Sequence, residues 1–217
     1  MEDIELKNIL KNGALELGVT LSEVDLGQFI TYLKELQAWN RKINLTSIES
    51  DKEIVIRHFL DSLTTLPFVK DSKRLLDIGS GAGFPGIPLK IAAPLLEVTL
   101  LDSVEKKVHF MRHIIRTLGL KGIEATYGRA EDPKIIERYG SLFDCVISRA
   151  FAELGKFLEL SLPFVAKGGS IIAIKGPAFD RELEEARYVS GVEGPEIHEI
   201  KVPFEDRKNV LVIFRKA

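Results

Sequence analysis

Apolar residues recur at helical spacing through the first seventy residues of the chain. The pattern predicts a first helix that ends near Gly18 and a second that runs from Ser22 to about Trp39. Ser22 and Asp25 are spaced as a capping box, in which each residue satisfies a backbone N–H at the start of the helix. A polar stretch separates these from a third helical segment around residues 54–63. The first part of the chain is therefore predicted to be helical throughout.

After Lys73 the pattern changes to short apolar runs rich in β-branched residues, separated by longer stretches with helical spacing. Strands that alternate with helices indicate βαβ units and a parallel sheet. Helices are expected over residues 104–119 and 153–165. The expected strands are LLDI (75–78), VTLLD (98–102), IEATY (123–127), FDCVIS (143–148) and SIIAI (170–174).

The end of the chain departs from this alternation. After a helical segment near residues 180–188, only a short turn separates two strand-like runs, HEIKVPF (198–204) and NVLVIFRK (209–216). Because a parallel crossover needs a dozen or more residues, these two strands should pair antiparallel. The expected fold is α/β and Rossmann-like, with a mostly parallel seven-stranded sheet and an antiparallel last strand. We expect an N-terminal helical extension over residues 1–70 and a sheet domain over residues 71–217.

Composition narrows the class of protein. The chain has 217 residues, is 45% hydrophobic and 29% charged, and carries a net charge of −2. These values are typical of a globular protein and argue against a generally basic nucleic-acid coat. The single cysteine, Cys145, excludes a disulfide framework and a cysteine-cluster zinc site. The N-terminus lacks a signal-peptide pattern and no apolar run reaches membrane length, so we expect a cytoplasmic protein, a monomer without a membrane anchor.

Residues 75–86 read LLDIGSGAGFPG, a predicted strand that breaks into a glycine-rich turn. Glycine has no Cβ and tolerates positive φ, so a ligand can approach the backbone there. Gly81, Gly83 and Gly86 match the GxGxxG pattern of dinucleotide sites. Counted from the strand end, however, the spacing is D-x-G-x-G-x-G, which resembles the S-adenosylmethionine turn of class I methyltransferases. A carboxylate at Asp77 also suits an ammonium group better than a phosphate.

The ends of the later strands supply further candidates. Asp102 ends the second strand, where an acid accepts hydrogen bonds from ribose hydroxyls in both NAD and S-adenosylmethionine sites. The antiparallel last strand favours S-adenosylmethionine. Ala130 and Glu131 follow the third strand, where adenine is expected, and Arg149 ends the fourth. Two structural alternatives stay open: Glu131 as a helix N-terminal acid, and Arg149 as the ion-pair partner of Asp77, Asp102 or Glu131.

The sequence lacks residues that several other methyl transfers need. No Asn/Asp-Pro-Pro-Tyr/Phe motif for amino-group methylation is present. Cytosine C5 methylation needs a cysteine nucleophile, whereas Cys145 lies in a strand pattern and is expected to be a core residue. No clustered His, Cys and carboxylate residues indicate a metal. A nucleophile that needs little deprotonation, such as guanine N7, fits this pattern because its methylation depends mainly on alignment.

Six motifs occur in order along the chain: RKINLTS (41–47), RHFLDSL (57–63), DIGSGAGFPGIPL (77–89), LLDSVEKKVHF (100–110), ISRAF (147–151) and IKGP (174–177). Together they resemble the glucose-inhibited division protein B family, the bacterial guanine-N7 methyltransferases of small-subunit (16S) ribosomal RNA. The resemblance covers the chain from about Asn40 onward. It implies a class I methyltransferase fold, S-adenosylmethionine as the cofactor, and small-subunit ribosomal RNA or the small ribosomal subunit as the substrate.

The resemblance also implies roles for individual residues. Arg149 and Lys175 are expected to face RNA or the base, and Asp61 to organise the site entrance, so these three are the catalytic candidates, through positioning. Arg57 and His58 match family motifs around the site mouth. Taken with the turn and strand-end residues above, the candidate cofactor contacts are Asp77, Gly79, Gly81, Gly83, Phe84, Asp102, Ser103, Ala130, Glu131 and Arg149.

RNA binding has one independent indication. Residues 104–121 carry five basic residues against one acid, although a solvated helix face is the usual explanation of such a run. Three other functions stay open: a methyltransferase for another acceptor, a non-catalytic S-adenosylmethionine-binding ribosome assembly factor, and an NAD-dependent oxidoreductase. The last needs a catalytic acid or Tyr–Lys pair that we do not find. A basic surface around Arg149 and Lys175 argues against a small-molecule or protein acceptor.

Overall fold

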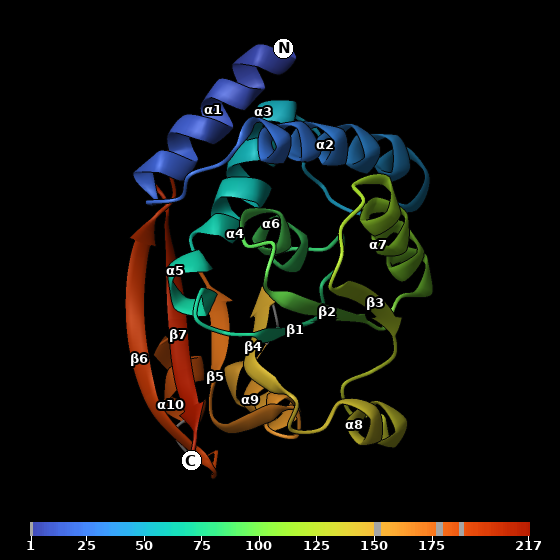
Figure 1. Cartoon of the computed structure of the whole chain (residues 1–217). Helices are drawn as coiled ribbons and strands as arrows, with labels where there is room; N and C mark the ends of the chain where they lie inside the picture. Colours follow the sequence, from blue (N-terminus) through green and yellow to red (C-terminus); the bar gives the residue numbers. More distant parts are fainter. Residues whose placement is uncertain (1, 150–152, 177–179, 187–188) are drawn as a thin grey trace.

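Seven strands form one sheet at the centre of the structure, a computed structural model that describes residues 2–149, 153–176, 180–186 and 189–217 (Figure 1). The strands are β1 (Arg74–Ile78), β2 (Glu97–Asp102), β3 (Ile123–Tyr127), β4 (Phe143–Arg149), β5 (Val165–Lys175), β6 (Val192–Lys201) and β7 (Lys208–Lys216). Their order in the sheet is β3-β2-β1-β4-β5-β7-β6. Strands β1 to β5 pair in parallel, and β7 pairs antiparallel with both β5 and β6. The predicted α/β fold with an antiparallel last strand is confirmed.

Helices cover both faces of this sheet. They are α1 (Asp3–Glu16), α2 (Glu23–Ile43), α3 (Asp51–Ile54), the π-helix η1 (Val55–Leu60), α4 (Asp61–Leu63), α5 (Leu66–Val69), α6 (Gly86–Ala92), α7 (Glu105–Thr117), α8 (Pro133–Tyr139), α9 (Leu154–Ser161) and α10 (Asp180–Ala186). Side chains of a strand alternate between faces, so Leu75 packs in the core with α2, α6 and α7, whereas Leu76 packs in the core with α8 and α9. Figure 1 shows these two helical layers on opposite sides of the sheet.

The helices before β1 belong to the same core as the sheet. The capping box predicted at Ser22 is present: its Oγ accepts from the Asp25 N–H at 3.2 Å, and the Asp25 carboxylate accepts from the Ser22 N–H at 2.8 Å. Near the end of α2, Trp39 packs 5.5 Å from the ring of Phe110 on α7. One apolar cluster contains side chains from α1 through to β7. Because residues before and after position 70 share this cluster, the predicted boundary between a helical extension and a sheet domain stays a prediction.

Several element boundaries differ from the prediction, among them the end of α9, the starts of β5 and β6, and the end of β6, which lies at Lys201 and not at Phe204. The helix expected over residues 153–165 ends at Ser161, because Pro163 follows and Val165 already pairs with Phe143 as the start of β5. Strand β5 continues past a register shift and Gly168, which has a φ of +74°. Strand β6 begins at Val192, six residues before the predicted start. The predicted starts of both strands were too late, because the first part of each strand contains glycine and an irregular register.

Candidate active site

The glycine turn lies between β1 and α6, at the carboxyl edge of the sheet. Gly79, Gly81 and Gly83 have φ values of +72°, +61° and +97°, which L-residues with a side chain rarely adopt. The Gly79 N–H donates to the carbonyl of Leu101 at 2.8 Å, so the turn crosses the end of β2. A Cβ placed on Gly79 would meet no atom within 4 Å. The turn therefore presents bare backbone to an open space.

Asp102, at the end of β2, anchors this turn. One carboxylate oxygen accepts from the Gly81 N–H at 2.8 Å, and the other accepts from the Val104 N–H at 2.8 Å. Each carboxylate oxygen has two lone pairs, so each retains acceptor capacity for a hydroxyl group. The sequence predicted a ribose contact for Asp102 but gave no indication that its side chain also holds the glycine turn.

Asp77 is completely buried beneath the turn. Its Oδ2 accepts from the Gly86 N–H at 3.0 Å, whereas Oδ1 has no hydrogen-bond partner among the described residues. Burial raises the pKa of Asp77 to about 8, against the opposing effect of the Gly86 hydrogen bond. The carboxyl group is thus largely protonated at neutral pH in the ligand-free protein, and a nearby cation would favour its ionised form.

We expect Asp77→Asn to raise the melting temperature of the ligand-free protein by about 5 °C at pH 8, and hardly at all near pH 4. Because the folded pKa lies above the unfolded value, the carboxyl costs nothing below about pH 4 and progressively destabilises the fold as pH rises to about 8. Asparagine does not ionise and still accepts from Gly86. Thermal unfolding at both pH values tests this, and a gain independent of pH would contradict it.

Three more of the predicted cofactor contacts follow β2 and β3, and two of them, Ala130 and Glu131, were predicted to lie at the adenine. Ser103 is exposed and Ala130 is buried, while Glu131 is exposed and pairs with Arg129 at 3.5 Å. The helix α8 is capped by Asp132, whose carboxylate accepts from the Lys134 N–H at 2.9 Å. Glu131 is exposed and directly precedes this cap, so it lies near the N-terminus of α8, where an acid is favoured.

The ring of Phe84, in the glycine turn, is surrounded by two aromatic rings and one guanidinium group. The ring of Tyr32 from α2 stacks on it at 5.4 Å, and the His58 imidazole from η1 stacks at 4.5 Å. The Arg149 guanidinium lies 5.2 Å above the same ring. Tyr32 also donates its hydroxyl to the carbonyl of Ala82. The helices before residue 70 thus hold the turn directly, a contribution of Tyr32 that the sequence pattern did not reveal.

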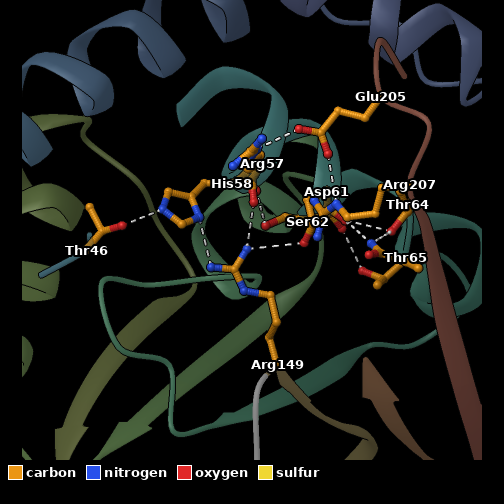
Figure 2. Close-up of polar contacts among 11 residues, drawn as sticks. Thr46, Arg57, His58, Asp61, Ser62, Thr64, Thr65, Arg149, Glu205 and Arg207 are labelled. Carbon is orange, nitrogen blue, oxygen red and sulfur yellow. Dashed lines mark hydrogen bonds and ion pairs between the residues drawn. The ribbon is translucent and has the colours of Figure 1, made fainter. Parts of the chain in front are cut away.

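His58 is a neutral imidazole with a defined tautomer. Burial and the Arg149 charge lower the pKa of His58 to about 3. Its Nδ1 accepts from Arg149 at 2.9 Å because a guanidinium can only donate. Its Nε2 therefore carries the proton and donates to the Thr46 hydroxyl at 2.8 Å. Figure 2 shows His58 lying between Thr46 and Arg149.

Arg149 pairs with Asp61, not with an acid at a neighbouring strand end. Its guanidinium donates to Asp61 Oδ2 at 3.2 Å and to the Arg57 carbonyl at 3.1 Å. The expected alternative partners Asp77, Asp102 and Glu131 were therefore wrong. Figure 2 shows that Asp61 is shared: its Oδ1 accepts from Arg207, in the β6–β7 turn, at 2.7 Å. The carboxylate is only 3% exposed.

Lys175 ends β5 next to Arg149. Its ammonium lies 2.5 Å from Glu182 on α10, and that carboxylate also accepts from the Leu154 N–H at 3.0 Å. A cavity of about 330 Å³ brings together Asp61, Arg149 and Lys175, the three catalytic candidates. A second cavity, of about 910 Å³, is lined by Ile54 and by residues 36, 37, 40, 41 and 44–49. The sequence predicted the first grouping but neither Glu182, seven positions from Lys175, nor Arg207, 146 positions from Asp61.

Other predicted features have structural positions as well. Cys145 is buried in β4, and burial raises its pKa to about 12, so the thiol is a core group rather than a nucleophile. Within the described ranges, no three His, Cys, Asp or Glu side chains lie close enough to hold a metal ion. The same ranges contain no helix with the length and apolar character needed to cross a bilayer.

Comparison with solved structures confirms the fold class. Cofactor-bound Rv0187 from MTB matches with a TM-score of 0.61 and 15% identity, over 88% of this chain and 89% of that one. The O-methyltransferase from Bacillus cereus in complex with SAH matches with a TM-score of 0.58 and 19% identity, over 86% of this chain and 91% of that one. At these identities the likeness shows the fold alone, a class I methyltransferase fold.

Comparison of sequences gives the family. Residues 25–210 match the family described as GidB, rRNA small subunit methyltransferase G. A protein named ribosomal RNA small subunit methyltransferase G from Geotalea uraniireducens is 43% identical over 97% of both chains. Its namesake from Acetivibrio thermocellus is 40% identical over 99% of this chain and 90% of the relative. The resemblance read from the six motifs is thereby confirmed, and this chain belongs to the GidB family.

Proposed function

We propose that this protein transfers the methyl group of S-adenosylmethionine to N7 of one guanine in small-subunit (16S) ribosomal RNA. The observation that carries the proposal is the open glycine turn, anchored by Asp102, beside a cavity lined by Arg149 and Lys175. Membership of the GidB family supports it. The basic cavity lining argues against a small-molecule or protein acceptor.

The residues around the turn fit S-adenosylmethionine. The backbone at Gly79 borders open space, and the buried Oδ1 of Asp77 has no partner among the described residues. An ammonium group close to Asp77 would stabilise its ionised form. We therefore assign the turn from Gly79 to Phe84 to the amino-acid end of the cofactor. When bound, the cofactor supplies an electrophilic methyl group on its sulfonium.

The nucleoside end is assigned to the neighbouring strand ends. Asp102 accepts hydrogen bonds from the ribose hydroxyls with the lone pairs that its two backbone contacts leave. Ser103, exposed directly after it, lies beside the ribose. The backbone of Ala130 and the exposed Glu131 hold the adenine. These roles follow from strand-end position and, for Asp102 and Ser103, from the motif LLDSVEKKVHF in which they lie.

The chain positions the nucleophile rather than deprotonating it. The N7 lone pair of guanine lies in the ring plane and is available at neutral pH, so alignment supplies most of the rate. Arg149 is held by His58 and Asp61, which fixes the direction of its guanidinium. It presents a fixed positive charge to the RNA, as Lys175 does from the adjacent strand. Asp61 acts on the RNA only through the arginines that it orients.

Transfer of labelled methyl from S-adenosylmethionine to small-subunit ribosomal RNA, and to small subunits, tests this function. We expect alkaline–aniline treatment of the product to cleave at one guanine, which identifies both N7 methylation and the nucleotide. Arg149→Ala should lower kcat/KM for RNA methylation about 100-fold, with little change in cofactor affinity. Lys175→Ala should act in the same direction more weakly. Lys156→Ala, which removes an exposed ion-paired lysine on α9, is the control.

No transfer to either substrate, in spite of measurable cofactor binding, would contradict the proposed function. If Arg149→Ala abolishes cofactor binding by itself, that residue belongs to the cofactor site and not to the RNA side.

A further inference from the structure

The cavity at the carboxyl ends of β4 and β5 has an unusual charge pattern. Half of the ten residues that line it are basic, and Asp61 is the one acid lining it in the described part of the chain. Because β7 runs antiparallel, its first residue, Lys208, meets the edge where β4 and β5 end. The lining residues are Ile48, Arg57, Asp61, Arg149, Ile174, Lys175, Gly176, Arg207, Lys208 and Asn209.

The basic side chains are held in place from outside the cavity. Glu205 pairs with Arg207 at 2.8 Å, Glu199 pairs with Lys208 at 2.7 Å, and Glu182 pairs with Lys175. None of these three carboxylates is among the described residues that line the cavity. They reduce the net charge of the region, but they add no acid to the described lining of the cavity itself. In that lining, five basic residues stand against the single acid Asp61.

Asp61 does not neutralise the arginines that share it. Its two oxygens each accept one guanidinium, from Arg149 at 3.2 Å and Arg207 at 2.7 Å, so a single negative charge faces two positive ones. A guanidinium has five N–H donors, and the carboxylates of Asp61 and Glu205 use only part of the set on Arg207. Arg207 is 43% exposed, and an anion entering the cavity can reach it.

We propose that the β6–β7 turn, through Arg207 and Lys208, completes with Arg149 a binding site for a backbone phosphate of the RNA substrate. A phosphodiester matches forked guanidinium donors and a nearby ammonium. Arg149 links this phosphate site to the proposed cofactor site, because it lines the cavity and lies over Phe84 of the glycine turn. The phosphate held here belongs to a nucleotide next to the methylated guanine. This inference rests on the proposed function and extends it to residues outside the family motifs quoted above.

The test compares RNA binding by variants of the β6–β7 turn and of β7. Binding of small-subunit ribosomal RNA by the full chain is measured across a series of salt concentrations for wild type, Arg207→Gln, Lys208→Gln and the double variant. Arg215→Gln is the matched control, since Arg215 lies at the other end of β7 and pairs at 3.7 Å with exposed Glu196. Arg207→Lys keeps the charge and tests for rescue. Cofactor affinity is measured for each variant.

We expect the double variant to bind RNA about tenfold more weakly at low salt, with the slope of log affinity against log salt reduced by about 0.7 to 1. Its KM for RNA should rise, while its cofactor affinity stays close to wild type. Arg207→Lys should recover most of the slope, and Arg215→Gln should leave it unchanged.

Equal salt slopes for wild type and the double variant would overturn the inference, as would an equal loss in Arg215→Gln. A loss of cofactor affinity without a change of slope would show that Arg207 serves only to hold Asp61, and would overturn it too. The proposed function is judged separately, by guanine-specific cleavage of RNA methylated by the wild type. The phosphate-site inference is judged by the salt slopes of RNA binding alone, also where no guanine-specific cleavage of the RNA is found.

Discussion

Asp102→Ala is expected to weaken S-adenosylmethionine binding about 100-fold, roughly 2.7 kcal/mol. The carboxylate accepts from the Gly81 and Val104 N–H groups, and in our assignment also from the ribose hydroxyls. Hydrogen bonds to a charged group contribute about 1.5–3 kcal/mol each. The substitution removes the ribose contacts and loosens the turn that wraps the amino-acid end. Isothermal titration of the purified variant with the cofactor measures the effect.

Asp144 provides a matched control for Asp102. It lies in β4 near the opposite edge of the sheet, where its carboxylate accepts from the N–H groups of Lys73 and Arg74 at 2.8 and 2.9 Å. Asp144→Ala therefore also removes an acid that binds two backbone donors, and is expected to leave cofactor affinity unchanged. If Asp102→Ala binds S-adenosylmethionine as tightly as wild type does, the assignment of Asp102 to the ribose is wrong. A parallel loss in both variants would point to general destabilisation instead.

The second large effect is expected at Gly83. Alanine there would adopt a φ of +97°, its Cβ would overlap the side chain of Ile87, and it would lie 2.9 Å from the Tyr32 hydroxyl oxygen. Backbone strain of about 1–2 kcal/mol and overpacking of about 1–3 kcal/mol should together destabilise the fold by about 3 kcal/mol. Urea unfolding without ligand gives this free energy of unfolding directly.

Gly79→Ala separates cofactor binding from folding. Its φ of +72° carries similar backbone strain, but the added methyl meets no protein atom within 4 Å, so the loss of stability should stay near 1–2 kcal/mol. The methyl enters the space that we assign to the cofactor, and affinity should fall at least tenfold. If Gly79→Ala binds S-adenosylmethionine as wild type does, the turn does not wrap the cofactor. If Gly83→Ala is as stable as wild type, the packing around Phe84 is not rigid.

Local patterns were sufficient for the parts of the site that stand at strand ends. Alternating β-branched runs place Asp77, Asp102 and Arg149 at the carboxyl ends of parallel strands, and such ends meet at one edge whatever the details of packing. The capping box at Ser22 was equally local, because its two members are three residues apart. These features depend on contacts within a few residues, which is why the sequence alone was enough to predict them.

Local sequence patterns could not predict the partners of Arg149. Asp61 lies 88 positions earlier in the chain, on a short helix whose placement over the sheet edge depends on the whole apolar interface. Arg207 reaches the same carboxylate from 146 positions away. Sequence spacing carries no signal for pairs at these separations, so the acids at neighbouring strand ends were the natural but wrong candidates.

The contact between Tyr32 and the glycine turn bears on the order in which the chain is made. Tyr32 precedes Ala82, whose carbonyl accepts its hydroxyl, by fifty positions, so α2 leaves the site of synthesis well before the turn. Helix α2, which holds the turn through Tyr32, is therefore already made when the turn is synthesised. Phe110, which packs against Trp39 of α2, comes later still. Ala130 and Glu131, which we assign to the adenine, follow β3, so a newly made chain has the support of the turn before it has the other side of the proposed cofactor site.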